Sequence, residues 1–175
     1  MKQINYQYYK SPHGELILGS FNGRLCMCDW RYRKMRNAID SRIKNGLKAE
    51  FVEQNDATLE EAKLQLDEYF SYKRKIFNIS LLMQGTEFQV KDWNGLIKIP
   101  FGKTLSYLEL AENVVNVNSV RAVANANGAN AISIFIPCHR IIGSNGKLVG
   151  YAGGLKAKEK LLNLEYDLFT SATCA

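Results

Sequence analysis

The stretch that decides the fold is LSYLELAENVVNVNSVRAVANANGANAISIFIPCHR, residues 105–140. It opens with Ser106-x-x-Glu109, a capping box in which the two side chains satisfy backbone N–H groups at a helix start. A short connection, Asn116–Asn118, follows, and Ser119 can then cap a further helix. Two capped helices joined by a short turn predict a helix-turn-helix.

The second of these helices has an unusual face. Arg121 projects from a surface that is otherwise nearly bare, because its neighbours include Ala122, Ala124 and Ala126. Small side chains with one arginine suit close approach to a nucleic-acid backbone or groove. They equally suit packing of this helix against another helix, and the spacing alone leaves both interpretations open.

The end of the quoted stretch carries the reactive chemistry. Residues 131–138 are predicted to form a buried strand or extended segment that delivers Cys138 to a turn, with His139 directly after it. A thiol is a useful nucleophile only as thiolate, so an adjacent base is required, and we expect His139 to act through a water molecule. Glu165 lies on a helical face with Leu161 and is the best group to orient the histidine. From spacing alone, an inert buried Cys138 and a solvated Glu165 remain possible.

Two further segments, one after and one before residues 105–140, also carry structural signals. Lys147–Tyr151 is predicted to form a short wing strand after the turn that begins at Gly143. A second domain is expected to begin near Gly85, with a helix that starts at Thr86 and ends before Pro100.

The first half predicts a mixed α/β unit. Glu15–Phe21 and Arg24–Trp30 are typical of strands and flank Asn22-Gly23, a strong hairpin signal. Thr58-x-x-Glu61 predicts a capped helix. The basic run of residues 31–36 is either a solvated surface or a phosphate contact.

Composition narrows the function classes. The 175 residues are 46% hydrophobic and 23% charged, which is typical of a globular protein, and the net charge of +6 favours a polyanionic partner. No segment is long enough to span a membrane or resembles a signal peptide, so a cytoplasmic location with reduced cysteines is expected. Four cysteines and two histidines are present, and Cys26 and Cys28 are expected to be small buried hydrophobic residues. His13 and His139 are too few for a Cys/His zinc site in the first half, so we expect no metal.

Together these motifs resemble the O6-alkylguanine-DNA alkyltransferase family. The central match is Ile136-Pro137-Cys138-His139-Arg140, followed by Gly150-Tyr151-Ala152-Gly153-Gly154-Leu155. Phe88-Gln89 with Trp93, Ser106-Tyr107, Arg121-Ala122-Val123 and Asn130 fall at the family spacing. The match is good from Phe88 to Glu165 and looser before it, through Ser11-Pro12-x-Gly14.

The resemblance implies a fold. It implies an α/β N-terminal domain with a small ribonuclease-H-like sheet, residues 1–84. It also implies a mainly α, winged helix-turn-helix domain, residues 85–175, that binds DNA and accepts the alkyl group.

The resemblance also implies residue roles. Cys138 is the nucleophile and permanent alkyl acceptor, His139 takes its proton, Glu165 orients His139, Asn130 holds the active-site segment, and Tyr107 helps to rotate the nucleotide. Arg121 enters the duplex in place of the extruded nucleotide. The implied DNA-binding set is completed by Ser106, Val120, Ala122 and Ala124. The implied base pocket consists of Ile141, Tyr151 and Ala152.

The implied reaction is a single event. The thiolate displaces the alkyl carbon from O6 of a flipped guanine, and possibly from O4 of thymine, to leave a thioether that water in the site cannot hydrolyse. The implied partner is duplex DNA bound through the minor groove by a monomer, without a cofactor, in the cytoplasm or in the nucleus of a eukaryote.

The sequence departs from the family at the approach to DNA. Asn116-Val117-Asn118-Ser119 replaces a turn that often contains glycine or proline, Val120 is larger than the usual alanine, and Ala124 replaces a frequent glycine. Two alternatives come from other functional classes. One is a winged-helix DNA-binding protein with a structural Cys138, and the other is a Cys-His hydrolase.

Overall fold

The computed structural model describes residues 1–173, with side chains up to Tyr166, so Cys174 lies outside the described residues. The chain forms two compact units. The first contains Met1–Thr86 together with Ala131–Ser133, and the second contains Glu87–Asn130 and the chain from Ile134 onward. Inclusion of residues 131–133 in the first unit was not expected from the sequence.

A four-stranded sheet is the centre of the first unit, with strand order β3-β2-β1-β4. β1 (Lys2–Ser11), β2 (Gly14–Phe21) and β3 (Arg24–Trp30) are antiparallel, and β4 (Ala49–Glu53) is parallel to β1. The predicted hairpin is confirmed: Asn22 and Gly23 have φ of 49° and 74°, the positive values that the turn requires. The backbone of Cys28 on β3 also bonds to residues of the later segment, because its N–H donates to Ala131 O over 2.9 Å.

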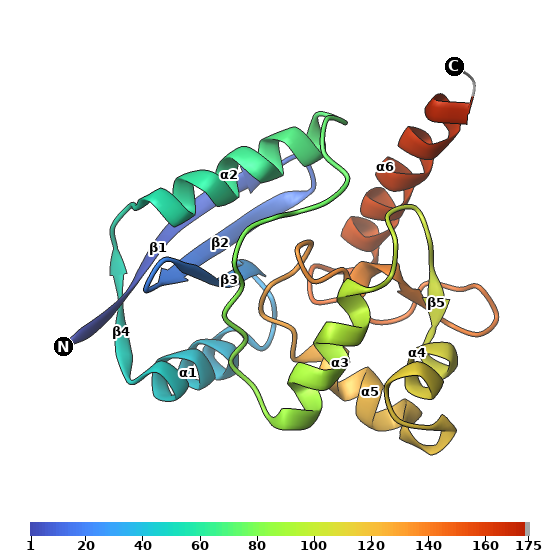
Figure 1. The fold of residues 1–175 in the computed structure, drawn as a ribbon, viewed down its shortest axis with the longest axis horizontal. Coiled ribbons are helices and arrows are strands. Elements are labelled where there is room, and N and C mark those ends of the chain that lie inside the picture. Colours follow the sequence, from blue (N-terminus) through green and yellow to red (C-terminus); the bar gives the residue numbers. More distant parts are fainter. Residues whose placement is uncertain (174–175) are drawn as a thin grey trace. The chain divides into compact units, whose positions relative to one another are not determined.

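Two helices complete this unit, and Figure 1 shows α2 running alongside β1 and β2. α1 (Arg36–Leu47) buries Ile39, Ile43 and Leu47 in a core that also contains Ile4 and Phe21. These residues share one helical face, so hydrophobic burial fixes the helix on the sheet.

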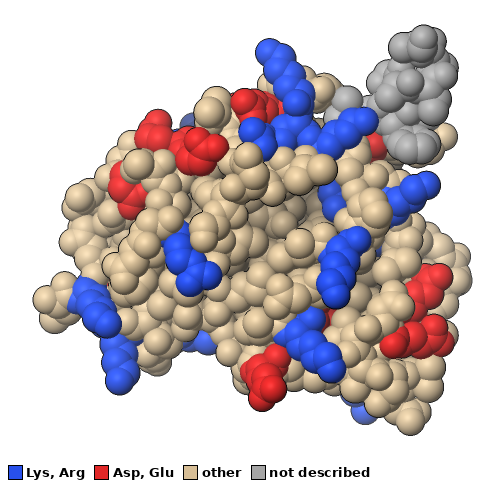
Figure 2. All heavy atoms as spheres, in the orientation of Figure 1, with Lys and Arg blue, Asp and Glu red and all other residues tan. Residues whose placement is uncertain are grey.

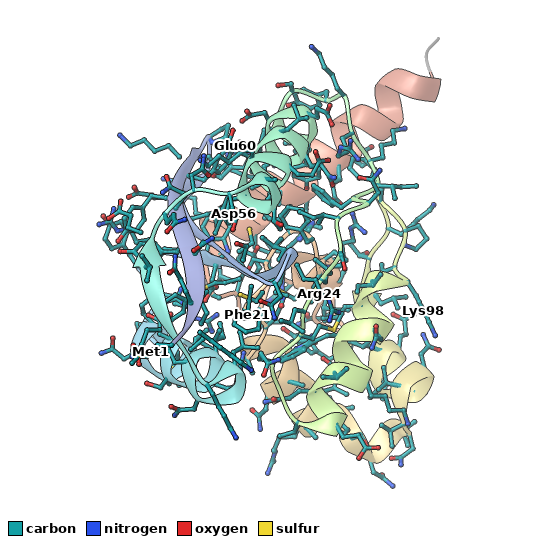
Figure 3. All side chains as sticks on the ribbon, turned by 60° about the vertical axis from the view of Figure 1, so that its left-hand side comes forward. Met1, Phe21, Arg24, Asp56, Glu60 and Lys98 are labelled. Carbon is teal, nitrogen blue, oxygen red and sulfur yellow. The ribbon has the colours of Figure 1, made fainter. Side chains whose placement is uncertain are left out.

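The start of α2 (Ala57–Phe70) corrects a prediction. Asp56, not Thr58, is the N-cap, and its carboxylate accepts the N–H of Leu59. Figure 3 labels Asp56 at the start of the helix and Glu60 in its first turn. Asp56 also accepts hydrogen bonds from Ser20 and Asn5, so contacts with the sheet decided between two cap-forming residues.

The basic run near the end of β3 is largely committed to internal ion pairs. Arg33 and Arg36 both pair with the buried carboxylate of Asp29, over 3.0 and 2.9 Å, and Arg36 also pairs with Asp40. Arg31 pairs with Glu15. These three arginines therefore have protein partners, which weakens the interpretation of the run as a phosphate contact.

The second unit is mainly helical. Its elements are α3 (Glu87–Ile97), β5 (Leu105–Ser106), α4 (Tyr107–Val114), the 3₁₀ turn η1 (Val117–Ser119), α5 (Val120–Gly128), the 3₁₀ turn η2 (Cys138–Arg140), β6 (Ile141–Ile142) and α6 (Leu155–Thr173). β5 and β6 pair in parallel. The predicted architecture, a small-sheet unit followed by a helical unit with a helix-turn-helix, is confirmed.

Of the two helix caps predicted in this unit, one is formed and the other is not. The capping box of Ser106 and Glu109 is present in full at the start of α4. Ser119 does occupy the N-cap position of α5, but its side chain makes no capping bond, and Asn116 instead caps η1. Ser119 is also the last residue of the 3₁₀ turn η1. Its hydroxyl therefore donates to Asn116 within the connection and does not cap α5.

Two predicted segments differ from the structure. Residues 131–138 are buried as expected, but the segment is broken by a turn at Ile134, where φ is +74°. A β-branched residue in that region is a genuine outlier, which an extended segment would not contain. Lys147–Tyr151 contains no strand; the turn before it is closed by Gly143 N–H donating to Lys147 O over 2.9 Å.

Two further observations concern the surface. No helix among the described residues is long and apolar enough to cross a membrane. On the face drawn in Figure 2, basic and acidic side chains are interspersed with broad uncharged areas, so the net charge is not gathered there into one continuous basic surface.

Asp92 is an unusual feature of the helical core. It is fully buried on α3 next to Trp93, and neither carboxylate oxygen has a hydrogen-bond partner among the described residues. Burial raises the pKa of Asp92 to about 7. An unsatisfied buried polar group destabilises a fold by about 1–3 kcal/mol.

We predict that Asp92→Leu raises the free energy of unfolding by about 1–3 kcal/mol at neutral pH. Because the pKa of Asp92 is higher in the folded protein, the folded state holds a proton that the unfolded state has released. The wild-type protein should therefore lose stability as pH rises from about 4 through 7, relative to Asp92→Asn, which cannot ionise. Urea denaturation across this pH range measures both effects. Parallel curves for wild type and Asp92→Asn would contradict the prediction.

Candidate functional site

Cys138 is held at the first residue of η2. Its N–H donates to Ile136 O over 2.8 Å, and Arg140 N–H donates to Pro137 O over 3.0 Å, which closes the turn. The Cys138 side chain is buried, with 7% of its surface exposed. The conformation of this turn, rather than a strand, sets the direction of the sulfur.

Asn130 connects the end of α5 to this turn. Its amide Nδ2 donates to Ile136 O over 3.0 Å and to Cys138 Sγ over 3.2 Å. A hydrogen bond donated to sulfur favours the thiolate over the thiol. The structure thus brings together Asn130 and Cys138, two residues that the family resemblance had singled out.

A buried carboxylate organises the two residues after Cys138. His139 Nε2 lies 2.8 Å from Glu165 Oε1. Arg140 donates Nε to Glu165 Oε2 over 2.9 Å and Nη2 to Oε1 over 3.0 Å. Burial favours the neutral acid, but His139 and Arg140 outweigh it and hold the pKa of the Glu165 carboxyl well below its usual range.

The geometry defines the tautomer of His139. When the ring is neutral, its Nε2 donates to the anionic Glu165 and Nδ1 is left as an acceptor. Nδ1 has no hydrogen-bond partner among the described residues. His139 can therefore accept a proton at Nδ1, while Glu165 stabilises the resulting imidazolium.

Arg140 is a site residue that the sequence analysis missed. It is buried, it forms the two bonds to Glu165, and its Nη1 donates to Ile99 O over 2.6 Å. Its place between the apolar run that ends at Pro137 and the pair Ile141-Ile142 is a usable signal, because a buried arginine needs an acidic partner. Glu165 lies on an apolar helical face, so its carboxylate in turn needs a basic partner.

An open pocket of about 720 Å³ lies over α5. The side chains that line it are Tyr107, Asn118, Val120, Arg121, Ala124 and Ser144. Tyr107, Val120, Arg121 and Ala124 were predicted site residues, whereas Asn118 and Ser144 were missed because a loop position carries no periodic signal. Arg121 is exposed and available to a ligand.

The other predicted DNA-binding residues lie elsewhere. Ala122 is exposed on α5 but does not line this pocket. The hydroxyl of Ser106 accepts the N–H of Glu109, so its role in the structure is to cap α4.

The residues predicted for the base pocket are not among the six that line this opening. Ile141 is fully buried in β6, where it pairs with Leu105. Tyr151 and Ala152 are partly buried in the loop before α6. A pocket role for these three residues stays a prediction.

Tyr107 is fixed by the loop before α6. Its hydroxyl donates to Val149 O over 3.1 Å, and burial, with Cys138 as a second cause, raises its pKa. Gly150 has φ of +56°, a conformation that disfavours other residues, and a Cβ there would lie 3.6 Å from the Tyr107 hydroxyl.

Lys158 is the second residue that the sequence analysis missed. It is fully buried on α6, and its Nζ donates to Val149 O over 2.9 Å and to Gly150 O over 3.2 Å. Its position was detectable, because it precedes Leu161 and Glu165 by three and seven residues and so lies on their helical face.

The groups at this site suit nucleophilic chemistry by the thiol of Cys138. Within the described residues, no group of three or more His, Cys, Asp and Glu side chains is placed to hold a metal ion. The arrangement provides a thiol, a histidine with a free acceptor, an orienting carboxylate and a tyrosine hydroxyl.

Comparison with known proteins gives a consistent result over the whole chain. Residues 87–167 match the model of the 6-O-methylguanine DNA methyltransferase DNA-binding domain, and residues 4–83 match that of the ribonuclease-like domain of the same proteins. The chain is 43% identical over 174 residues to a methylated-DNA--protein-cysteine methyltransferase of Mycobacterium leprae, covering 97% of this chain and 98% of the relative. It is 49% identical over 169 residues to the constitutive enzyme of that name from Bacillus subtilis, covering 91% and 94%.

Solved structures agree with this result. The crystal structure of Mycobacterium tuberculosis OGT in complex with DNA is similar, with a TM-score of 0.80 and 34% identity over 94% of each chain. An O6-methylguanine DNA methyltransferase from Methanococcus jannaschii has a TM-score of 0.61 and 26% identity, covering 91% of this chain and 93% of its own. The chain therefore belongs to the 6-O-methylguanine DNA methyltransferase family.

Proposed function

We propose that this protein repairs DNA by moving an alkyl group from O6 of guanine to Cys138, once per molecule. The observation that carries the proposal is the contact of Cys138 with Asn130 beside the His139–Glu165 pair. Membership of the methyltransferase family, over both halves of the chain, supports it.

The proposed mechanism begins with the thiol. His139 takes the Cys138 proton at Nδ1 through a water molecule, and Glu165 stabilises the charged ring. The thiolate then attacks the alkyl carbon, the S–C bond forms, and the C–O6 bond breaks with its electrons left on the guanine. The hydroxyl of Tyr107 donates to N3 of the base and so stabilises this leaving group. A thioether has no leaving group that water can displace here, so the protein does not turn over.

The proposed encounter with DNA requires the base to leave the helix. The recognition helix α5 lies in the minor groove, and Arg121 fills the space of the extruded nucleotide. Tyr107 and Arg121 line one opening, which supports an assignment of both to this step. Val120, Ala122, Ala124 and Ser106 complete the DNA-binding surface, with Ile141, Tyr151 and Ala152 around the base.

We also propose that residues 1–84 and 85–175 are the two domains, and that the protein acts as a monomer. No cofactor enters the proposed reaction. The proposed location is the cytoplasm, or the nucleus if the source is eukaryotic.

The direct test is a mass measurement. Incubation with duplex DNA that carries O6-methylguanine should add one methyl group per protein, on the peptide that contains Cys138. Cys138→Ser should bind the same duplex and gain no mass, because the alcohol is a far weaker nucleophile at neutral pH. Unmodified wild-type protein that still binds DNA would favour the winged-helix alternative, whereas ester or amide turnover would favour the hydrolase.

Glu165→Gln should both slow transfer and destabilise the fold. The substitution leaves the buried guanidinium of Arg140 without its counter-charge, which costs about 3 kcal/mol. Because the pKa of Glu165 is held low, its contribution to stability is present at neutral pH and is lost in acid as the carboxylate is protonated. Denaturation at neutral and acidic pH measures this, and Glu159→Gln, at an exposed position of the same helix, is the control. Equal effects of the two substitutions would remove Glu165 from the network.

Arg121→Ala should reduce transfer from duplex DNA more than from single-stranded DNA. The arginine stabilises the cavity left by a flipped nucleotide, and a single strand has no such cavity. A difference of roughly tenfold between the two substrates corresponds to about 1.4 kcal/mol. Single-turnover rates on matched oligonucleotides measure the effect, with Lys98→Ala as an exposed basic control. Equal losses on both substrates would exclude this role.

A further inference from the structure

The sheet of the first unit carries a cavity of about 240 Å³ to which the proposed function gives no role. Three aromatic rings, two apolar side chains and one carboxylate line it: Tyr6, Tyr8, Phe51, Ile17, Met27 and Asp40. Sites that hold drug-sized ligands have volumes of about 300–1,000 Å³. The size of this cavity therefore suits a smaller ligand.

The strand register places the three rings on one face of the sheet. Tyr6 and Tyr8 alternate along β1 and so share a face, and Tyr8 lies opposite Ile17 of β2. On the other side of β1, Ile4 lies opposite Phe51 of β4, which puts Phe51 on the same face. α1 packs on this face around the buried Ile4, whereas Tyr6 is partly exposed and Tyr8 is 36% exposed. The helix thus leaves this end of the face open to a ligand.

The rings are arranged nearly at right angles. The Tyr6 ring centre lies 5.7 Å from that of Tyr8, with an interplanar angle of 80°, and 6.1 Å from that of Phe51, with an angle of 83°. The faces of such rings attract a cation that lies within about 6 Å of the ring centre. The chain itself gives an example, because the guanidinium carbon of Arg31 lies 4.0 Å from the Tyr8 centre. Arg31 does not line the cavity.

Two carboxylates near the cavity are available to a cation. Asp40 accepts both hydrogen bonds of Arg36 at Oδ1, over 2.9 and 2.6 Å, and its Oδ2 has no partner among the described residues. Glu53 is exposed and lies opposite Tyr6 in the register of β4 and β1. Burial, and then the neighbouring Tyr8 and Glu53, raise the pKa of Tyr6, which agrees with a carboxylate close to this ring.

The arginines of this region do not cancel that negative charge. Arg31 already has a carboxylate partner, and Arg36 is shared between Asp29 and Asp40. Glu53 forms no ion pair with the side chains that the structure describes, so its charge is left unbalanced. Aromatic faces beside an unbalanced carboxylate favour a cation over a neutral or anionic ligand.

We propose that this cavity binds a small quaternary ammonium ion, a cation that carries methyl groups in place of N–H donors. Five of the six lining side chains are aromatic or apolar and can pack against those methyl groups. A primary ammonium instead needs acceptors for three N–H donors, and Asp40 is the one carboxylate in the lining. The inference goes beyond the proposed function and does not rest on it, because no residue of the cavity takes part in that reaction.

The experiment compares two ligands of the same shape. Choline carries a trimethylammonium group, and its uncharged carbon analogue, dimethylbutanol, has the same methyl groups without the charge. Each is titrated calorimetrically into the full-length protein without DNA. Choline should bind roughly tenfold more tightly, since only the cation is attracted by the rings and the carboxylates. Proton NMR should show nuclear Overhauser contacts from the choline methyl groups to the rings of Tyr6 and Phe51.

Two pairs of variants separate the rings from the charge. Tyr6→Leu should weaken choline binding about tenfold, whereas Tyr6→Phe, which keeps the ring, should retain it. Glu53→Gln should weaken binding several-fold. Its control is Glu50→Gln on the same strand, because Glu50 is on the opposite face of the sheet and pairs with Lys44. Thermal unfolding of each variant establishes that it is folded.

Several results would overturn the proposal. Equal affinity for choline and dimethylbutanol would leave the cavity an apolar site only, and no choline binding at millimolar concentrations would remove it as a site. Tighter binding of butylammonium, which has the chemistry of a lysine side chain, would exclude the preference for a quaternary ion. Methyl contacts to other rings alone would place choline elsewhere, and this measurement on the wild-type protein is decisive even if Tyr6→Leu does not fold. None of these results bears on methyl transfer to Cys138, which is measured separately.

Discussion

The buried carboxylate of Glu165 is the interaction on which the helical unit depends. It receives His139 and Arg140 from the turn after Cys138, and the backbone N–H of Gly102 over 3.3 Å. Arg140 in turn donates to Ile99 O. One anion on α6 therefore fixes η2 and the loop after α3, and a buried anion is tolerated only when it is satisfied in this way.

The same carboxylate links stability with chemistry. It keeps Nε2 of His139 engaged, which leaves Nδ1 as the acceptor for a proton. It also forms an ion pair with Arg140, so the positive charge of that residue stabilises the fold. At the thiol itself, Asn130 contributes a hydrogen bond from its amide to the sulfur of Cys138.

The segment between α5 and Cys138 performs two structural tasks. Residues 131–133 bond to Cys28 on β3, through Ala131 O over 2.9 Å and Ser133 N–H over 2.6 Å. The chain then reverses at Ile134, whose φ of +74° costs about 1–3 kcal/mol and is sustained by complete packing of its side chain. A continuous strand here could not place Asn130 within 3.2 Å of Cys138 Sγ.

The sequence by itself determined the hairpin at Asn22-Gly23, the capping box at Ser106 and the helix-turn-helix, because turn chemistry and capping act between near neighbours. The candidate residues around Cys138 came from the resemblance to a family, since their spacing alone left an inert cysteine possible. Only the tertiary structure decided that Asp56 rather than Thr58 caps α2, that Ile134 interrupts the expected strand, and that residues 147–151 form a loop. It also revealed the hydrogen-bond partners of the buried Arg140 and Lys158. A buried charge is defined by partners that are distant along the chain, and those partners cannot be identified from local spacing.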